Sequence, residues 1–330
     1  MKLLCLIAKH GGELDDTIEI DGCCVRSGTE AKCLGYWWSS NLFATKSVHE
    51  NIQKARRAFF YFGSIGVFQG DLSPLSTRSV IETCVVPILL YGSENWILTD
   101  VLLKKLDSFL AELAKRALKW PKYHSNTAAL VVLDLESAWP RVFRRKLSFL
   151  RKLLDVNGVG VGVAAMKALL DDVEMVCLVR ECRELEDGLD LNFTNKILCN
   201  DNISMKEIKS KLREVDKEKL LRRCTEKAPI IAVVAEKIMW PRLWDKVRDL
   251  GDRHVKGLQS LARIMSSPAK GKRPCPLCDV SAIEKDLIDH ILEDYYQRLK
   301  MSMNEILKNL ESEDLKFLYV FWSVYRSAYS

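Results

Sequence analysis

The sequence has no apolar run of the roughly 20 residues that a helix needs to cross a bilayer, so it predicts a protein that does not span a membrane. Glycine and proline are scarce, at 16 and 9 of 330 residues, which excludes collagen-like and low-complexity classes. No internal repeat of fixed period is present either. Hydrophobic residues make up 48% and charged residues 28%, as in folded globular chains. At roughly 100–200 residues per domain, this length predicts two compact units.

The chain also lacks a convincing secretion signal, because its first apolar stretch ends early, at Lys9 and His10. The eleven cysteines are an odd number, and most stand singly in apolar surroundings, as Cys84 does. Such cysteines are typical small buried hydrophobic residues. We therefore expect a reducing intracellular compartment, cytoplasmic or nuclear.

The charge is only mildly basic, at +6, and this value alone indicates no partner. Its distribution is more informative. Residues Val101 to Lys152 contain twelve Lys/Arg and four Asp/Glu, so the rest of the chain is slightly acidic. A local excess of this kind is typical of a surface that binds a polyanion. The alternative is that these charges lie on ordinary solvated helix faces.

Hydrophobic periodicity predicts a mainly α fold with a small β-hairpin patch near the N-terminus. Alternation, aromatic content and glycine punctuation between Ile18 and Trp38 predict two or three short strands. Helical spacing then predicts helices at residues 48–62, 75–90, 99–121, 140–157, 160–170, 204–223, 229–251, 255–265 and within 284–329.

Several residues predict where these helices begin, bend and end. Ser73 is suited to cap a helix whose first position is Pro74. Pro87 and Pro241 should kink or break the helices that contain them, because proline has no N–H to donate. Periodicity lapses between Asp187 and Asp201, where we expect a linker.

Four contiguous strings go beyond hydrophobic patterning. They are Lys32–Trp38, Ile52–Phe60, Cys84–Trp96 and Leu113–Pro121. Together they resemble the C-terminal portion of reverse transcriptases from animal non-LTR (LINE-type) retrotransposons. The resemblance is close over residues 18–155 and loose as far as the region of Cys275.

This resemblance implies a division of the chain. Leu34, Gly35 and Tyr36 would form the terminal hairpin of the polymerase palm, near the primer grip. Residues 1–46 would be the remnant of the palm end and 47–157 a thumb-like helical bundle. A second helical domain at 158–266 and a zinc-knuckle region with C-terminal helices at 267–330 would follow.

In the family the thumb lies along the template–primer duplex, so the resemblance implies basic side chains that contact phosphates. Such contacts give affinity and register without base identity. The residues suited to this role are Lys115, Arg116, Lys119, Lys122, Arg144, Arg145 and Lys146. Trp120 could stack beside them, or it could anchor the core ahead of Pro121.

The catalytic carboxylates of a polymerase are missing. The reaction needs carboxylates that hold two metal ions roughly 4 Å apart. In the family these lie well upstream of the leucine-glycine turn, whereas Asp15 and Asp16 precede Leu34 closely. They fit an ordinary polar turn better than a metal dyad. We therefore expect a truncated fragment that is not an enzyme.

A second motif resembles three of the four ligands of a zinc site. Cys275, Cys278 and His290 have the required residue types and spacing, and Asp294 could complete a tetrahedral shell. Glu293, water or His254 are other candidates for the fourth ligand. The alternative is a decayed knuckle with two free thiols and no zinc.

The sequence thus predicts a catalytically inactive fragment that binds RNA or an RNA–DNA duplex weakly and without sequence preference. The alternative is a non-catalytic helical protein-interaction module, or a remnant without a selected function. Separation from the palm should expose an apolar association surface at Leu34, Tyr36 and Trp37. If Trp37 and Trp38 were fully enclosed by helices, the fragment would be a self-sufficient module. Complementation by a separate palm chain is a third hypothesis.

Overall fold

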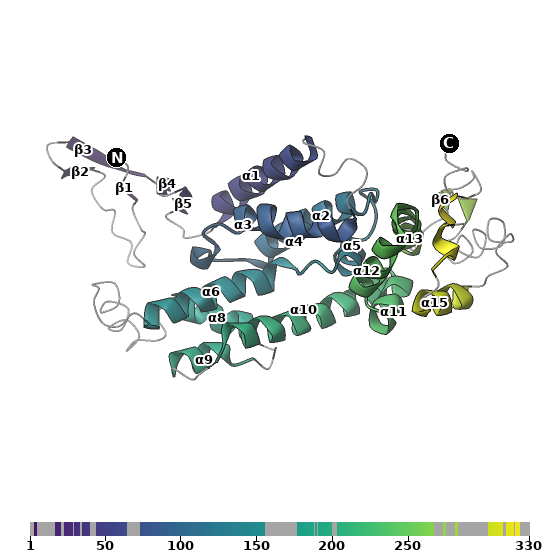
Figure 1. The fold of residues 1–330 in the computed structure, drawn as a ribbon. Helices are drawn as coiled ribbons and strands as arrows, with labels where there is room; N and C mark the ends of the chain where they lie inside the picture. The colour runs from purple at the N-terminus through teal and green to yellow at the C-terminus, as the bar shows by residue number, and fades with distance from the viewer. Residues whose placement is uncertain are drawn as a thin grey trace. The chain divides into compact units, whose positions relative to one another are not determined.

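The computed structural model describes residues 3–4, 17–20, 23–28, 30–33, 35–39, 44–64, 73–155, 177–187, 189, 191–199, 203–266, 273–274, 281–282, 303–312, 315–319 and 321–323. Its elements are mostly helices, with short strands at the beginning, which confirms the predicted fold class (Figure 1). The chain divides into two compact units. Unit 1 comprises residues 1–58, 84–107 and 138–213, and unit 2 comprises 59–83, 108–137 and 214–330. The four domains implied by the resemblance stay a prediction.

The strands form three small sheets. In the first, β3 (Cys23–Gly28) lies between β1 (Leu3–Leu4), to which it is parallel, and β2 (Thr17–Ile20), to which it is antiparallel. In the second, β4 (Glu30–Cys33) pairs antiparallel with β5 (Tyr36–Ser39). Cys33 lies opposite Tyr36, so the turn has two residues, and Gly35 in it has a φ of 81° that favours glycine. The third pairs β6 (Arg273–Pro274) with β7 (Ser281–Ala282).

The helices follow in order from Thr45 onward. They are α1 (Thr45–Ser64), α2 (Pro74–Val80), the π-helical turn η1 (Ile81–Val85), α3 (Val86–Leu89), the 3-10 turn η2 (Ser93–Asn95), α4 (Asp100–Ala117), α5 (Asn126–Leu133), α6 (Ala138–Asp155), α8 (Cys177–Glu186), α9 (Phe193–Leu198), α10 (Met205–Lys227), α11 (Pro229–Lys237), α12 (Trp240–Leu250), α13 (Asp252–Met265) and α15 (Met303–Glu311).

Proline and serine act at the helix boundaries as the sequence predicts. Ser73 Oγ accepts a hydrogen bond from Ser76 N, and Pro74 occupies the first turn of α2. The backbone widens into η1 directly before Pro87, which cannot donate to the preceding turn. The break predicted at Pro241 is confirmed, because α11 ends at Lys237 and α12 begins at Trp240 after Met239, whose φ is 64°.

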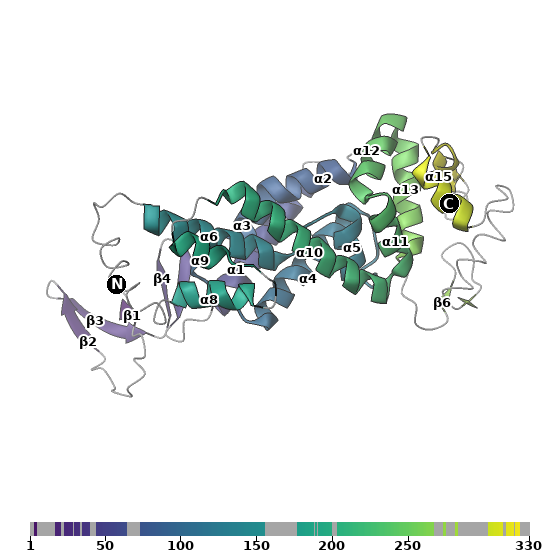
Figure 2. The ribbon, with the colours of Figure 1, turned by 90° about the horizontal axis from the view of Figure 1, so that it is seen from below.

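In unit 1, helices α8 and α9 pack against α6 (Figures 1 and 2). Their apolar faces form one buried cluster together with Ile203 and the first turns of α10. Its buried members are Phe143, Leu147, Leu150, Val179, Cys182, Phe193, Ile197, Ile203, Ile208 and Leu212.

The predicted linker at 187–201 is wrong, because α9 lies within it and buries Phe193 and Ile197 in this cluster. Glu186 Oε1 accepts from the backbone N–H groups of Phe193 and Thr194 at 2.6 and 3.0 Å. A short helix can therefore form without a longer periodic pattern, because the carboxylate of Glu186, a few residues earlier, accepts from its first N–H groups.

The β4–β5 hairpin is attached to the helices of unit 1 by specific contacts. Ser47 Oγ on α1 accepts from Trp37 N and donates to Trp37 O. The Tyr36 ring packs against Gly92, whose φ of 74° is left-handed and where a Cβ would lie 2.8 Å from the ring. Asn51 Nδ2 donates to the carbonyls of Leu89 and Tyr91, which holds the chain just before this glycine.

In unit 2, α11 and α12 pack against α5, and α12 packs against α13. The tryptophans Trp240 and Trp244 are both buried there, with ring centroids 6.3 Å apart. Trp244 Nε1 donates to Val132 O at 2.9 Å, so the α5–α12 interface has a directional contact as well as apolar burial. At Gly257 a Cβ would lie 2.3 Å from Leu318 O, which makes α13 and residues 317–319 close neighbours.

Candidate nucleic-acid interface

Lys146 on α6 is the most enclosed of the seven basic residues expected to contact phosphates. Its side chain is 2% exposed and lies within unit 1. Nζ donates to Trp96 O at 2.7 Å, to Glu94 O at 3.4 Å and to Glu181 Oε2 at 2.5 Å. An ammonium has three hydrogens to donate, so these partners account for all of them. Lys146 therefore has a structural role within unit 1.

Arg144 and Arg145 precede Lys146 on α6 and are both half-buried. Arg145 donates through one terminal nitrogen to Leu90 O at 2.6 Å. Burial lowers the pKa of Arg145 from its ordinary value, with smaller contributions from Glu94, which raises it, and from Arg144, which lowers it. The guanidinium remains charged even so, because an arginine pKa lies far above neutral pH.

Lys115 on α4 in unit 2 is also buried, with 7% of the residue exposed. Its Nζ donates to Lys122 O at 2.8 Å and to Asn126 Oδ1 at 2.6 Å. Burial lowers the pKa of Lys115. The lysine thus fastens the segment after α4 to the helix and is turned away from solvent.

The backbone at the end of α4 explains how Lys119 reaches the surface. Lys119 N donates to Arg116 O, and Trp120 N donates to Lys115 O at 2.7 Å. This pair of bonds is the Schellman arrangement, in which the residue after the helix adopts a left-handed conformation. Lys119 has a φ of 56° and is exposed, at a position where glycine is the usual residue.

Arg116, Lys119 and Lys122 are the exposed members of the predicted set in unit 2. Helix α1 carries two exposed aromatic residues in the same unit, Phe60 at 47% and Tyr61 at 64%, of which Phe60 contacts Arg116. The Arg116 guanidinium lies over the Phe60 ring, 4.8 Å from its centroid, and also pairs with Glu112 at 3.2 Å. We call Phe60, Tyr61, Arg116, Lys119 and Lys122 the basic-aromatic surface.

Trp120 does not belong to this surface. It is 6% exposed, and its ring lies 5.6 Å from that of His124. His124 in turn shares a 2.7 Å hydrogen bond with Ser266 at the end of α13. Of the two roles considered for Trp120, the structure shows the core anchor.

The aromatic residues of β5 differ in their exposure. Tyr36 is 8% exposed, Trp37 is half-buried with Lys46 Nζ 3.5 Å from its ring centroid, and Trp38 is 39% exposed. The hairpin is therefore neither stripped of its packing partners nor fully enclosed. Leu34, the remaining residue of the expected association surface, lies outside the described residues.

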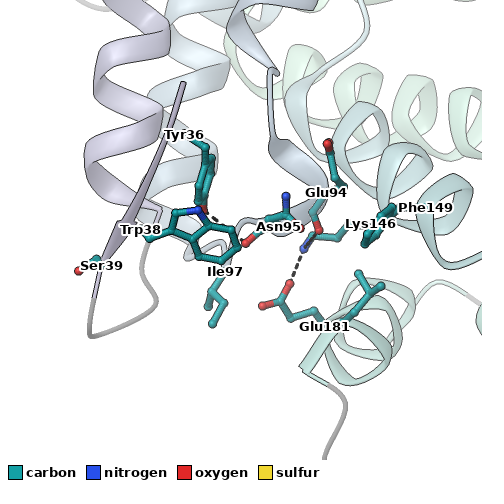
Figure 3. A pocket seen from close by; sticks show the side chains of 10 residues that line it. Tyr36, Trp38, Ser39, Glu94, Asn95, Ile97, Lys146, Phe149 and Glu181 are labelled. Atoms are coloured by element: carbon teal, nitrogen blue, oxygen red, sulfur yellow. Dashed lines mark hydrogen bonds and ion pairs between the residues drawn. The ribbon is translucent and has the colours of Figure 1, made fainter. Parts of the chain in front are cut away.

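A pocket of about 250 Å³ lies in unit 1, between β5, the η2 turn, α6 and α8 (Figure 3). Its lining includes Tyr36, Trp38, Phe149 and the Lys146–Glu181 ion pair. Burial raises the pKa of Glu181, and Lys146 opposes that rise. Sequence reasoning did not find this site, because α8 was not predicted and Glu181 stands in no recognisable motif.

The predicted metal ligands Cys275, Cys278, His290 and Asp294 all lie outside the described residues, as do Asp15 and Asp16. Within the described ranges, no cluster of three or more His, Cys, Asp or Glu side chains is arranged to hold a metal ion. Of the other candidates for a zinc ligand, His254 lies on α13, with its ring centroid 6.0 Å from that of Tyr319.

Among the helices whose residues are described, none combines the length and hydrophobicity needed to cross a membrane. In comparisons with known proteins, no family model, no curated protein and no solved structure matches this chain.

Proposed function

We propose that the chain is a non-catalytic nucleic-acid-binding protein, similar to the thumb of a LINE-type reverse transcriptase, that holds RNA or an RNA–DNA duplex through the basic-aromatic surface. An intracellular location, cytoplasmic or nuclear, is part of the same proposal. Binding without sequence preference requires cations for the phosphates and aromatic faces for the bases, and both residue types meet on this surface.

The observation that carries the proposal is the conformation of Lys119. A left-handed conformation costs a non-glycine residue about 1–2 kcal/mol, and glycine would avoid that cost. The strained backbone presents the lysine to solvent between Arg116 and Lys122. Strain of this kind is concentrated at functional sites.

Lys115 holds in place the segment that carries two residues of this surface, Lys119 and Lys122. Its ammonium does so by binding Lys122 O and Asn126 Oδ1. Ordering the backbone of this segment before binding reduces the entropy lost on association. Burying the Lys115 ammonium costs folding free energy, and a binding surface that needs a fixed backbone would explain why the chain retains it.

The test is fluorescence anisotropy of a labelled RNA–DNA duplex and a labelled single-stranded RNA with the full chain at low salt. Lys119→Gly should fold at least as well as the parent chain, because glycine relieves the left-handed strain, but it should bind less tightly. The triple variant R116Q/K119G/K122Q should weaken binding about tenfold or more.

The matched control is K227Q/K237Q/R242Q, which removes the same charge from three exposed positions elsewhere in unit 2. It should change affinity about twofold at most. Equal losses in the two triple variants would show that only overall charge matters. Absence of binding by the parent chain at 50 mM salt, about the lower end of the usual range, would refute the proposed function.

A further inference from the structure

The pocket of unit 1 offers a hydrogen-bond acceptor in a largely apolar setting. Lys146 contacts Glu181 through Oε2 only, and Oε1 has no hydrogen-bond partner among the described residues. In Figure 3 this second oxygen points away from the ammonium. The Glu181 side chain is 11% exposed, so the remaining acceptor is accessible from the pocket.

Aromatic faces lie opposite this acceptor. Strand geometry places Tyr36 and Trp38 on one side of β5 and Trp37 on the other. The rings of Tyr36 and Trp38 meet edge to face, with centroids 4.9 Å apart, and both line the pocket. Ile97, Phe149 and Leu178 complete the apolar lining. The pocket thus combines an exposed indole with Oε1 of Glu181 as an acceptor.

The charge and size of the pocket restrict what it can bind. Its charged lining residues are Lys146, Glu94 and Glu181, which sum to −1, and the Lys146 ammonium is already fully hydrogen-bonded. A phosphate or carboxylate would therefore find no available cation there and a net negative charge. The volume, about 250 Å³, is below the ~300–1,000 Å³ of typical small-molecule sites and suits a single long side chain.

We propose that this pocket binds an arginine side chain of a partner polypeptide, whose guanidinium stacks on Trp38 and donates to Glu181 Oε1. Arginine fits better than lysine, because its planar group can stack on an aromatic ring and donate to a carboxylate at the same time. This site lies in unit 1 and does not depend on the proposed nucleic-acid binding, which uses unit 2.

The test follows the indole N–H signals of the full chain by NMR during titration with acetyl-arginine-methylamide. A single side chain should bind in the millimolar range. Acetyl-citrulline-methylamide, which has nearly the same shape without the charge, should bind about fivefold more weakly or not at all. Uridine monophosphate should cause no saturable change. Equal binding of citrulline, tighter binding of the nucleotide or no saturation by the arginine compound would each overturn the proposal.

Variants locate the site. Trp38→Ala should weaken binding of the arginine compound about fivefold, whereas Trp37→Ala, on the opposite face of the same strand, should leave it unchanged. Glu181→Gln should reduce the preference for arginine over citrulline to about twofold or less. If Glu181→Gln does not fold, the contrast between the two tryptophan variants still decides the matter, because equal effects of both would contradict the proposed site.

Discussion

Each compact unit contains a buried lysine from the basic segment 101–152, and the two units accommodate it differently. In unit 1, Lys146 pairs with a carboxylate, Glu181, and donates to two backbone carbonyls. In unit 2, the acceptors of Lys115 among the described residues are neutral, Lys122 O and Asn126 Oδ1.

The difference shows that a lysine in a basic stretch of sequence need not be exposed, and that its contacts in the fold determine its role. Both residues belong to the basic segment expected to contact phosphates, yet neither is directed to solvent. A charge partner 35 positions away in the sequence, as Glu181 is from Lys146, makes one lysine a core residue of unit 1. In unit 2, Lys115 instead positions the segment that follows α4, through its bonds to Lys122 O and Asn126 Oδ1.

The largest expected effect is in unit 1. Lys146→Met should lower the free energy of unfolding by about 3–5 kcal/mol, because it leaves the largely enclosed Glu181 carboxylate, 11% exposed, without its charge partner. Urea denaturation measures this loss. The double variant K146M/E181L should recover most of the stability, because it removes both charges. A loss below about 1 kcal/mol in the single variant would contradict the buried pair.

An effect of intermediate size is expected in unit 2 from Gly257→Ala. The new methyl group would be 2.3 Å from Leu318 O, and backbone atoms must move to accommodate it. We expect a loss of about 1–3 kcal/mol in the free energy of unfolding.

Alkylation of buried cysteines can show which unit is affected. Burial raises the pKa of both Cys182 in unit 1 and Cys224 in unit 2 to about 12, so both thiols should react slowly in the folded chain.

Pulsed alkylation with mass-spectrometric mapping should therefore separate the two variants. Gly257→Ala should speed the modification of Cys224 more than that of Cys182, and Lys146→Met should do the reverse. If each variant accelerated both thiols equally, the two units would unfold as one cooperative body.

A smaller effect is expected from Lys115→Met. The variant removes the donor to Lys122 O and Asn126 Oδ1, but Asn126 is exposed and water can replace the ammonium there. We expect a loss of about 1 kcal/mol at neutral pH in urea denaturation. A loss as large as that of Lys146→Met would mean that a charge partner is not what distinguishes the two lysines.

The pH dependence of Lys115→Met provides a finer comparison. The pKa of Lys115 is lower in the folded chain, so the unfolded chain binds more protons between the folded and unfolded pKa values. The contribution of Lys115 to stability should therefore be greatest above the ordinary lysine pKa and fall as pH drops through the folded value. The difference in unfolding free energy between parent and K115M, measured against pH, should follow this direction; the opposite slope would contradict it.

The sequence predicted the class of fold, the cap at Ser73 and the break at Pro241, because these depend on nearby residues. It missed α9, which depends on Glu186 and on burial against α6. It also grouped seven basic residues by composition, whereas packing separates Lys115 and Lys146 from the exposed members. The unit 1 pocket could not be predicted, because it depends on tertiary contacts. The left-handed conformation of Lys119 is local, but glycine, its usual sequence signal, is absent from that position.

The most direct test of the account is the salt dependence of duplex binding by the parent chain and by R116Q/K119G/K122Q. If these three side chains each neutralise a phosphate, the slope of log affinity against log salt should become shallower by about 2–3 in the variant. An unchanged slope, whatever the change in affinity, would contradict the assignment of nucleic-acid binding to the basic-aromatic surface.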